Sequence, residues 1–210
     1  MAATDYSSLY KLCEHPDIVD IVAVQSLLSS SSPSTRTQLI SYQNEDGRTP
    51  LYAACQSGHH QVVEILLAAG TNKETPDKYG WELLHAACWN GHHQVVEMLL
   101  GAGANKETLT KCGSTPLHVA CEGGHNQAVE LLLAAGVNKE TLNYSRKKPI
   151  DVAGTGWGVK EENKQKVIKL LSSPLLPSRV SQIQSRIAQI RQRLNAKSSL
   201  PSPSPSPSPV

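Results

Sequence analysis

The chain contains no phenylalanine, and aromatic residues make up only 4% of its 210 residues. Alanine, leucine and valine are plentiful instead, which suits a core of small, closely packed helical side chains. This composition argues against an all-β sandwich. Apolar residues form 39% of the chain, so it can fold without a metal or disulfide staple.

The sequence also lacks a long apolar run. No segment approaches the roughly 18 apolar residues of a membrane-spanning helix, and the first ten residues have no apolar signal core. We therefore expect no membrane span. A cytoplasmic location is predicted, with the nucleus as the alternative.

The number of cysteines is odd, which does not fit a framework of paired disulfides. There are five, and three of them, Cys55, Cys88 and Cys121, recur at a fixed interval. They are predicted to be small core side chains in a reducing compartment.

Charge is divided unevenly along the chain. Residues 44–141 hold 6 basic and 11 acidic residues, whereas residues 142–210 hold 12 basic and 3 acidic ones. Such asymmetry concerns partners and solubility rather than fold. We expect this chain to bind protein partners and not nucleic acid.

An internal repeat dominates the middle of the sequence. Gly47, Gly80 and Gly113 are 33 residues apart, and the units 44–76, 77–109 and 110–142 are variants of one another. Each unit predicts a short helix that ends at a glycine, followed by a second helix with one apolar face.

The first helices begin with the pattern Thr-Pro-Leu, as at Thr49–Leu51 and Thr115–Leu117. Together with the later Gly-His and Val-Val-Glu-x-Leu-Leu segments, this pattern resembles the ankyrin repeat. The resemblance implies an all-α solenoid of helix-turn-helix units joined by short hairpin loops. It also implies protein binding, with no catalytic residue, cofactor or metal.

The middle unit departs from the pattern. It carries Glu82 where threonine is expected, so the hydroxyl-to-imidazole hydrogen bond toward His85 is absent and the helix start is predicted to be weaker. A second departure is Asn-Lys-Glu in place of Asp-Val-Asn after the second helix. The asparagine that is hydroxylated in some relatives is therefore replaced by glutamate.

A solenoid needs capping units at its ends. The predicted organisation is a capping repeat at 1–43, three full repeats at 44–142 and a capping repeat with an insertion at 143–171. The first cap should have helices at Leu9–Cys13 and Ile18–Leu28, followed by a loop at Ser29–Thr37. Beyond the solenoid we expect a linker at 172–177, an amphipathic helix at 178–196 and a disordered Ser-Pro tail at 197–210.

Two groups of residues invite a chemical interpretation. Cys112, His118, Cys121 and His125 have a spacing that suggests zinc, and His85 with Cys88 suggests a nucleophile and its base. The repeat register explains every one of them except Cys112, so neither site is predicted.

The glycine-rich segment Gly154–Gly158 could cradle phosphate. However, it lacks the Gly-Lys-Ser/Thr ending of a P-loop and follows no predicted strand. A flexible insertion is the preferred interpretation.

The partner surface is predicted on the concave face, where the repeat motif leaves positions free. Tyr79, Trp81 and Trp89 should be its energetic centre, although one of them, such as Trp81, could instead pack on a neighbouring unit. The predicted protein-binding set is Glu45, Asp46, Arg48, Gln56, Lys78, Tyr79, Trp81, Trp89, Asn90, Lys111, Ser114 and Glu122.

Pro174, Pro177 and Arg179 match the Pro-x-x-Pro-x-Arg pattern of SH3-domain ligands, which bind as a polyproline helix. A plain linker is the alternative.

The apolar residues of the following segment have helical spacing: Val180, Ile183, Ile187, Ile190 and Leu194. Basic residues flank them, which disfavours homo-oligomerisation through a parallel helix pair without excluding it. We expect docking on an acidic surface, either a calmodulin-like partner or the acidic repeats themselves.

The leading interpretation is a scaffold or inhibitor that holds a protein on its concave face. The alternative is a two-ended adaptor whose tail targets a second partner. An enzyme subunit ranks third.

Overall fold

The computed structural model describes residues 6–14 and 20–198, in which the regular elements are all helical. The capping unit contains α1 (Ser8–Glu14), α2 (Ile21–Ser30) and α3 (Pro33–Ser41). The three full units contain the pairs α4 (Pro50–Ser57) with α5 (His60–Ala68), α6 (Leu83–Trp89) with α7 (His93–Gly101), and α8 (Pro116–Glu122) with α9 (Asn126–Ala134). The last elements are a 3-10 helix (Pro149–Val152), α10 (Glu161–Ser172) and α11 (Pro177–Ser198).

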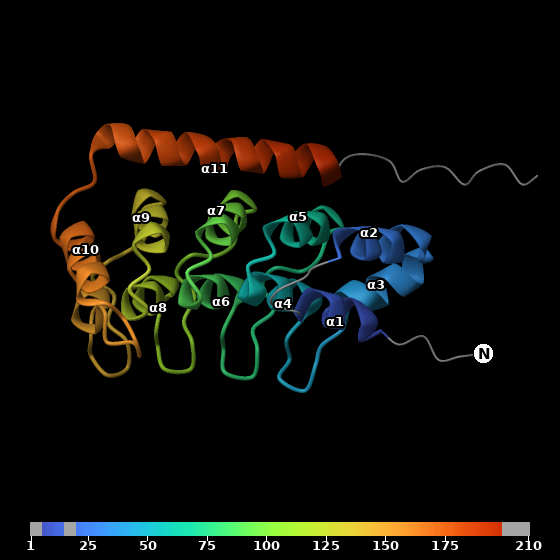
Figure 1. Ribbon diagram of the computed structural model, residues 1–210, viewed down its shortest axis with the longest axis horizontal. Coiled ribbons are helices and arrows are strands. Elements are labelled where there is room, and N and C mark those ends of the chain that lie inside the picture. Colours follow the sequence, from blue (N-terminus) through green and yellow to red (C-terminus); the bar gives the residue numbers. More distant parts are fainter. Residues whose placement is uncertain (1–5, 15–19, 199–210) are drawn as a thin grey trace, which may run out of the picture.

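The helices form two rows, with hairpin loops on one side (Figure 1). The inner helices α4, α6 and α8 pack on one another in sequence order, as do the outer helices α5, α7 and α9. The hairpins extend from the inner row, away from the outer row. This is the predicted solenoid of helix-turn-helix units.

Threonine caps begin two of the inner helices. The Thr49 and Thr115 hydroxyls accept the amides of Tyr52 and His118 at 3.2 and 3.3 Å, and proline follows at the first helical position. The Thr115 hydroxyl also contacts His118 Nδ1 at 2.8 Å.

The middle helix α6 keeps part of this arrangement without a threonine. The Glu82 amide donates to His85 Nδ1 at 3.2 Å, as the Thr115 amide does to His118. The contact between the Thr115 hydroxyl and the His118 imidazole therefore has no counterpart at Glu82, whereas the amide-to-imidazole bond is kept.

The hairpins have one repeated construction. In each unit a side-chain oxygen accepts the backbone amides two and four residues ahead, which closes the turn. Consecutive turns are also joined, because the amide of the next hairpin donates to the preceding one at 2.8–3.1 Å. The four accepting residues are Asn44, Asp77, Thr110 and Asn143.

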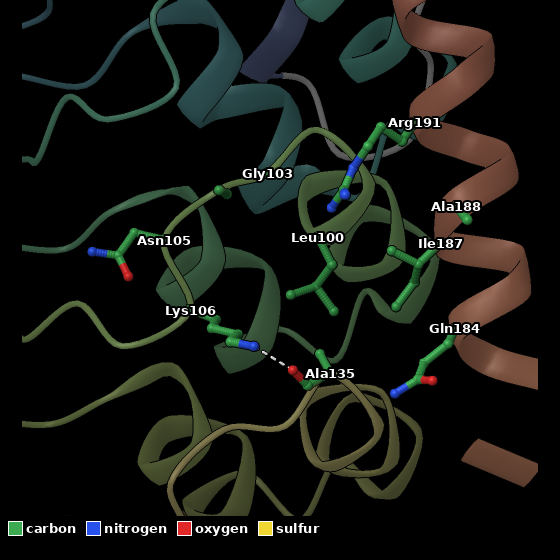
Figure 2. A pocket seen from close by; sticks show the side chains of 10 residues that line it. Leu100, Gly103, Asn105, Lys106, Ala135, Gln184, Ile187, Ala188 and Arg191 are labelled. Atoms are coloured by element: carbon green, nitrogen blue, oxygen red, sulfur yellow. Dashed lines mark hydrogen bonds between the residues drawn. The ribbon is translucent and has the colours of Figure 1, made fainter. Parts of the chain in front are cut away.

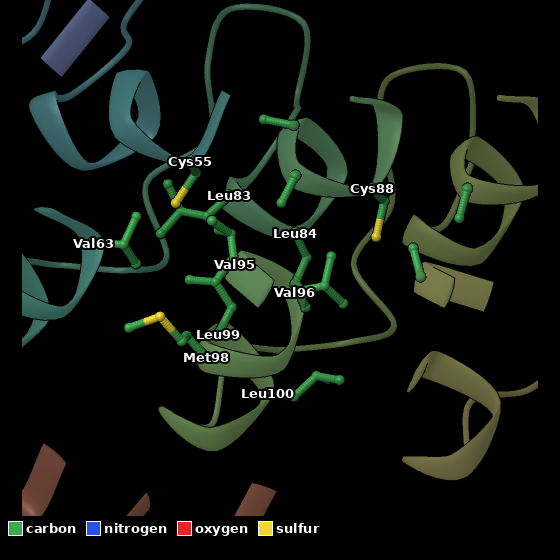
Figure 3. Close-up of a cluster of buried hydrophobic side chains, with 14 of the residues drawn as sticks. Cys55, Val63, Leu83, Leu84, Cys88, Val95, Val96, Met98, Leu99 and Leu100 are labelled. Atoms are coloured by element: carbon green, nitrogen blue, oxygen red, sulfur yellow. The ribbon is translucent and has the colours of Figure 1, made fainter. Parts of the chain in front are cut away.

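The core runs the length of the solenoid between its two rows of helices. Figure 3 shows its central part, where Cys55 and Cys88 lie among leucine and valine side chains. Both thiols are fully buried, as is that of Cys121, and burial raises the pKa of each. The prediction of core cysteines is confirmed.

The expected loop at Ser29–Thr37 is wrong. Helix α2 continues to Ser30 and α3 begins at Pro33, capped by the Ser32 hydroxyl, which accepts the Thr35 amide at 3.2 Å. Ser-Pro is a helix start as well as a loop signal. The predicted beginning of the second helix at Ile18 lies outside the described residues.

The C-terminal cap differs from a full unit. Its first helix is a single 3-10 turn, in which Asp151 accepts the Lys148 amide at 2.8 Å. The insertion is anchored, because the Gly154 and Gly156 amides donate to the Cys121 and Glu122 carbonyls. The inserted segment is thus tied to the third unit, and its flexibility stays a prediction.

The linker is shorter than predicted, and the helix after it is longer. Proline suits a first helical position, so α11 begins at Pro177 and only residues 173–176 connect it to α10. Lys197 and Ser198 belong to this helix and not to the tail. The predicted Ser-Pro disorder from residue 199 onward lies outside the described residues.

Helix α11 lies across the outer row and packs on α5, α7 and α9 (Figure 1). Within residues 6–14 and 20–198, no helix has the length and apolar character needed to cross a membrane.

Candidate functional site

Three aromatic side chains gather where the middle unit meets the first. Trp81 and Trp89, at the two ends of the α6 segment, form an edge-to-face pair with ring centroids 5.8 Å apart. Trp81 is half-buried and also packs on the core and on His85. Tyr79 and Trp89 remain 52% and 42% exposed, so they have surface to offer a partner.

These aromatics line a hollow of about 360 Å³. Six of the twelve predicted binding residues share it, which brings two units together at one place. They are Arg48, Gln56, Tyr79, Trp81, Trp89 and Asn90.

Two residues at the floor of this hollow were not in the predicted set. Asp77 is buried and accepts both Arg48 Nε and the Tyr52 hydroxyl at 3.3 Å. The Arg48 guanidinium also lies 5.1 Å from the Tyr52 ring centroid. Burial and the Asp77 carboxylate raise the pKa of Tyr52. A signal was available, since tyrosine replaces the repeat histidine at position 52.

The histidines hold the carbonyl ends of the inner helices. His125 Nε2 lies 2.8 Å from the Trp89 carbonyl, and His92 Nε2 lies 3.0 Å from the Gln56 carbonyl. Each contact fixes the backbone beside a predicted binding residue. The Gly-His pattern therefore positions the site.

Trp157 is an exposed aromatic residue that was not in the predicted binding set. It is fully exposed on the anchored loop of the C-terminal cap, and it shares a second hollow of about 540 Å³ with Trp89. Trp89 thus borders both hollows. The glycines around Trp157 predicted a flexible loop, and no sequence pattern indicated that the Trp157 side chain lies beside the same hollow as Trp89.

The remaining predicted residues lie on the hairpins and at the inner helix ends. Glu45, Lys78 and Lys111 are exposed, whereas Asp46, Ser114 and Glu122 are half-buried. Lys78 forms an ion pair with Asp46, which lowers the pKa of that carboxyl. None of these six residues lines the aromatic hollow.

The residues considered for zinc binding or nucleophilic chemistry have structural explanations. His85 Nε2 contacts the Ser114 carbonyl at 3.1 Å, and His118 Nε2 contacts the Lys147 carbonyl at 3.0 Å. Cys112 is exposed on a hairpin, away from the buried Cys121. Among the side chains of residues 6–14 and 20–198, no three of histidine, cysteine, aspartate or glutamate cluster closely enough to hold a metal ion.

The tail does not have the predicted SH3-ligand form, whereas α11 docks on the acidic repeats, which is one of the two predicted alternatives. Pro177 and Arg179 are helical, so the segment does not have the polyproline form of an SH3 ligand; Pro174 is exposed before it. Ile183, Ile187 and Leu194 are buried, and Val180 and Ile190 are half-buried. The acidic surface that α11 covers is the protein's own, so its apolar face is not open to a calmodulin-like partner in this state.

Two rows of repeated helix pairs with projecting hairpins define the class of protein, a helical repeat solenoid. Family models described as ankyrin repeats match residues 14–110 and 104–153, which together exceed half of the chain. The chain belongs to the ankyrin-repeat family.

Among curated relatives, the human 26S proteasome non-ATPase regulatory subunit 10 is 39% identical over 57 residues. The rat protein of the same name has the same identity over the same length. The match covers 27% of this chain and 23% or 22% of those relatives. The chain thus spans less than a quarter of the relatives that it matches.

Proposed function

We propose that this protein is a non-enzymatic interaction module that holds a protein partner on its concave face. The observation that carries the proposal is the hollow between the first and second units, where Tyr79 and Trp89 are exposed beside Arg48. Tyrosine, tryptophan and arginine are the residues that most often dominate interface energies. A scaffold or an inhibitor would use such a surface.

The geometry supports Trp89 as the centre of the contact. It borders both hollows, and the His125 contact to its carbonyl fixes its backbone. A partner that covers both hollows would bury Trp89 between Tyr79 and Trp157. Central, fully desolvated positions are where hot spots occur.

A cytoplasmic or nuclear location belongs to the proposal. The five cysteines are free thiols, and four of them are buried, which fits a reducing compartment.

The test uses Trp89→Ala in the full chain. A partner is captured from cell extract, identified, purified and titrated calorimetrically against both proteins. We expect the substitution to cost about 2 kcal/mol or more of binding free energy. The free energy of unfolding should fall by less, about 1 kcal/mol, because Trp89 is partly exposed and its ring pairs edge-to-face with Trp81.

Leu109→Ala is the matched control, since Leu109 is 47% exposed and borders neither hollow. It should leave partner affinity unchanged. Equal losses for the two variants, or a Trp89→Ala loss no larger than its loss of stability, would contradict the proposed surface.

A further inference from the structure

The outer face of the repeats carries a row of carboxylates with the period of the repeat. Glu64, Glu97 and Glu130 are 33 residues apart, one on each of α5, α7 and α9. Each is paired with an arginine of α11. Glu130 receives Arg179 at 2.7 and 3.0 Å, Glu97 receives Arg186, and Glu64 receives Arg193 at 2.9 Å.

The arginines have a period of their own, which is seven residues. Seven residues of an α-helix rise about 10.5 Å, and packed helices lie about 8–10 Å apart. Two turns of α11 therefore advance by nearly one repeat. Because the two periods match in space, one register satisfies all three pairs.

A second row of contacts follows the same rule. Gln184 Nε2 donates to the Ala134 carbonyl at 3.0 Å, and Arg191 Nε donates to the Gly101 carbonyl at 3.2 Å. The donors are seven residues apart and the acceptors 33. Ala134 and Gly101 end α9 and α7, where helical carbonyls lack partners within the helix. Figure 2 shows Gln184, Ile187 and Arg191 extending from α11 toward the ends of these helices.

The apolar side of α11 fills the space between the two polar rows. Ile183, Ile187 and Leu194 are buried there. Ile190 lies over Gly101, where a Cβ atom would be only 2.6 Å from its Cγ2. The corresponding residues of the other units are Ala68 and Ala134, so the middle unit has a glycine at the point of closest approach.

The burial of the Glu97 carboxylate indicates that a positively charged group is needed on this face. The Glu97 side chain is only 6% exposed, and its Oε1 atom is buried without a hydrogen-bond partner while Oε2 receives Arg186. A buried carboxylate is costly unless a positive group accompanies it.

We propose that the outer face of the three full repeats is a binding site for an amphipathic helix that carries cations every seven residues, and that α11 is its exchangeable resident ligand. This site is independent of the concave surface, because its residues come from the outer helices. Residues 173–176 connect α11 to the solenoid. This short linker gives α11 a high effective concentration at the outer face, so an external helix must compete with it for the site.

The experiment uses a fluorescent synthetic peptide of residues 177–198 as the probe. Its receptor is the full chain with Ile183→Asp and Ile187→Asp, which places two charges in the buried stripe and releases α11. We expect the peptide to bind this variant at least about tenfold more tightly than it binds the wild type, whose site is occupied. Circular dichroism verifies that the variant remains folded.

Charge exchange tests the recognition. A peptide with Arg179→Glu, Arg186→Glu and Arg193→Glu should bind the opened variant at least about tenfold more weakly, because three favourable pairs become repulsive. Adding Glu64→Lys, Glu97→Lys and Glu130→Lys to the opened variant should restore binding of that reversed peptide.

If the aspartate variant does not fold, Ala188→Pro opens the site instead, because proline breaks α11 at an exposed position. No peptide binding to a folded, opened variant would overturn the proposal. Equal binding of the normal and reversed peptides would overturn it as well. Loss of partner binding at Trp89 would affect only the concave surface, so the two proposals fail separately.

Discussion

Single residues show how the repeat assigns different environments to identical side chains. Cys55, Cys88 and Cys121 occupy one repeat position in the core, whereas Cys112 lies exposed on a hairpin. Burial disfavours the thiolate, and the thiolate is the reactive form. Reactivity should therefore differ sharply between these cysteines.

We predict that one thiol reacts rapidly with a thiol-specific reagent in the native protein. That thiol is Cys112, because the other four are buried and burial raises the pKa of Cys13 to about 12. Stopped-flow absorbance should give one equivalent in the fast phase, and Cys112→Ser should abolish it. Cys121→Ser is the control and should leave the fast phase intact. Two fast equivalents would contradict the structure.

His85 makes stability depend on pH. Burial lowers its pKa from 6.5 to about 4, and its two ring nitrogens face the Glu82 amide and the Ser114 carbonyl. The neutral ring suits both contacts, since Nδ1 accepts and Nε2 donates. Between pH 6.5 and 4 the unfolded chain binds the proton more readily, so acidification favours unfolding.

We predict that the free energy of unfolding falls as pH decreases from 7 to 4, with His85 contributing at most roughly 3 kcal/mol. His118 acts in the same direction, because burial also lowers its pKa. Urea unfolding of wild type and His85→Ala at several pH values measures the difference. The variant should be less stable at pH 7 but lose less on acidification.

Leu84→Val is the control for this experiment, since it weakens the same helix without removing a titrating group. It should retain the wild-type pH dependence. If His85→Ala retains that dependence too, the assignment to His85 is wrong.

At the scale of elements, α11 packs so closely on α7 that no room is left for a side chain at Gly101. Gly101 is helical without a positive φ angle, so alanine would suit α7 itself and is present at the equivalent positions of α5 and α9. Ile190 and the Ile187 carbonyl occupy the space that a Cβ atom would need. Local preference and tertiary packing therefore oppose each other at this residue.

We predict that Gly101→Ala lowers the free energy of unfolding of the full chain by about 1–3 kcal/mol, the usual cost of overpacking. Ile190→Ala should remove most of the clash, so the double variant should lose less than the sum of the two single losses. Denaturant titrations of all four proteins measure this coupling. Additive losses would show that the two residues do not meet.

In the N-terminal capping unit, too, local sequence preference and tertiary packing differ. A serine-rich segment with one proline predicted a loop, yet Ser32 and Pro33 begin α3. Arg36 Nε then donates to the Leu28 carbonyl at 2.8 Å, which ties α3 to the preceding helix. The residues that cap a helix also occur in turns, and only the packing of α3 on its neighbours distinguishes the two.

At the scale of the whole molecule, the acidic repeats and the basic C-terminal segment face each other within one chain. The basic helix lies on the acidic outer face, so part of the charge asymmetry is neutralised within one chain. The hairpins extend from the inner row, on the side of the solenoid opposite α11 (Figure 1). The face that α11 covers is thus distinct from the aromatic hollow that we propose as the partner surface.

The amino-acid sequence was sufficient to predict the helical solenoid, the buried cysteines and the closeness of Tyr79, Trp81 and Trp89, whereas their role as an energetic centre stays a prediction. These features follow from periodicity and from side-chain types at fixed repeat positions, which are local information. The pattern of α11 was also readable, as an apolar stripe flanked by arginines.

Which surface α11 covers depends on how the helices pack, because seven residues of α11 and 33 residues of the repeats span matching distances only in the folded molecule. Tertiary packing likewise brought Asp77 and Tyr52 to the floor of the aromatic hollow and Trp157 beside Trp89. Those neighbours lie on separate elements, and sequence spacing carries no information on how two elements approach each other.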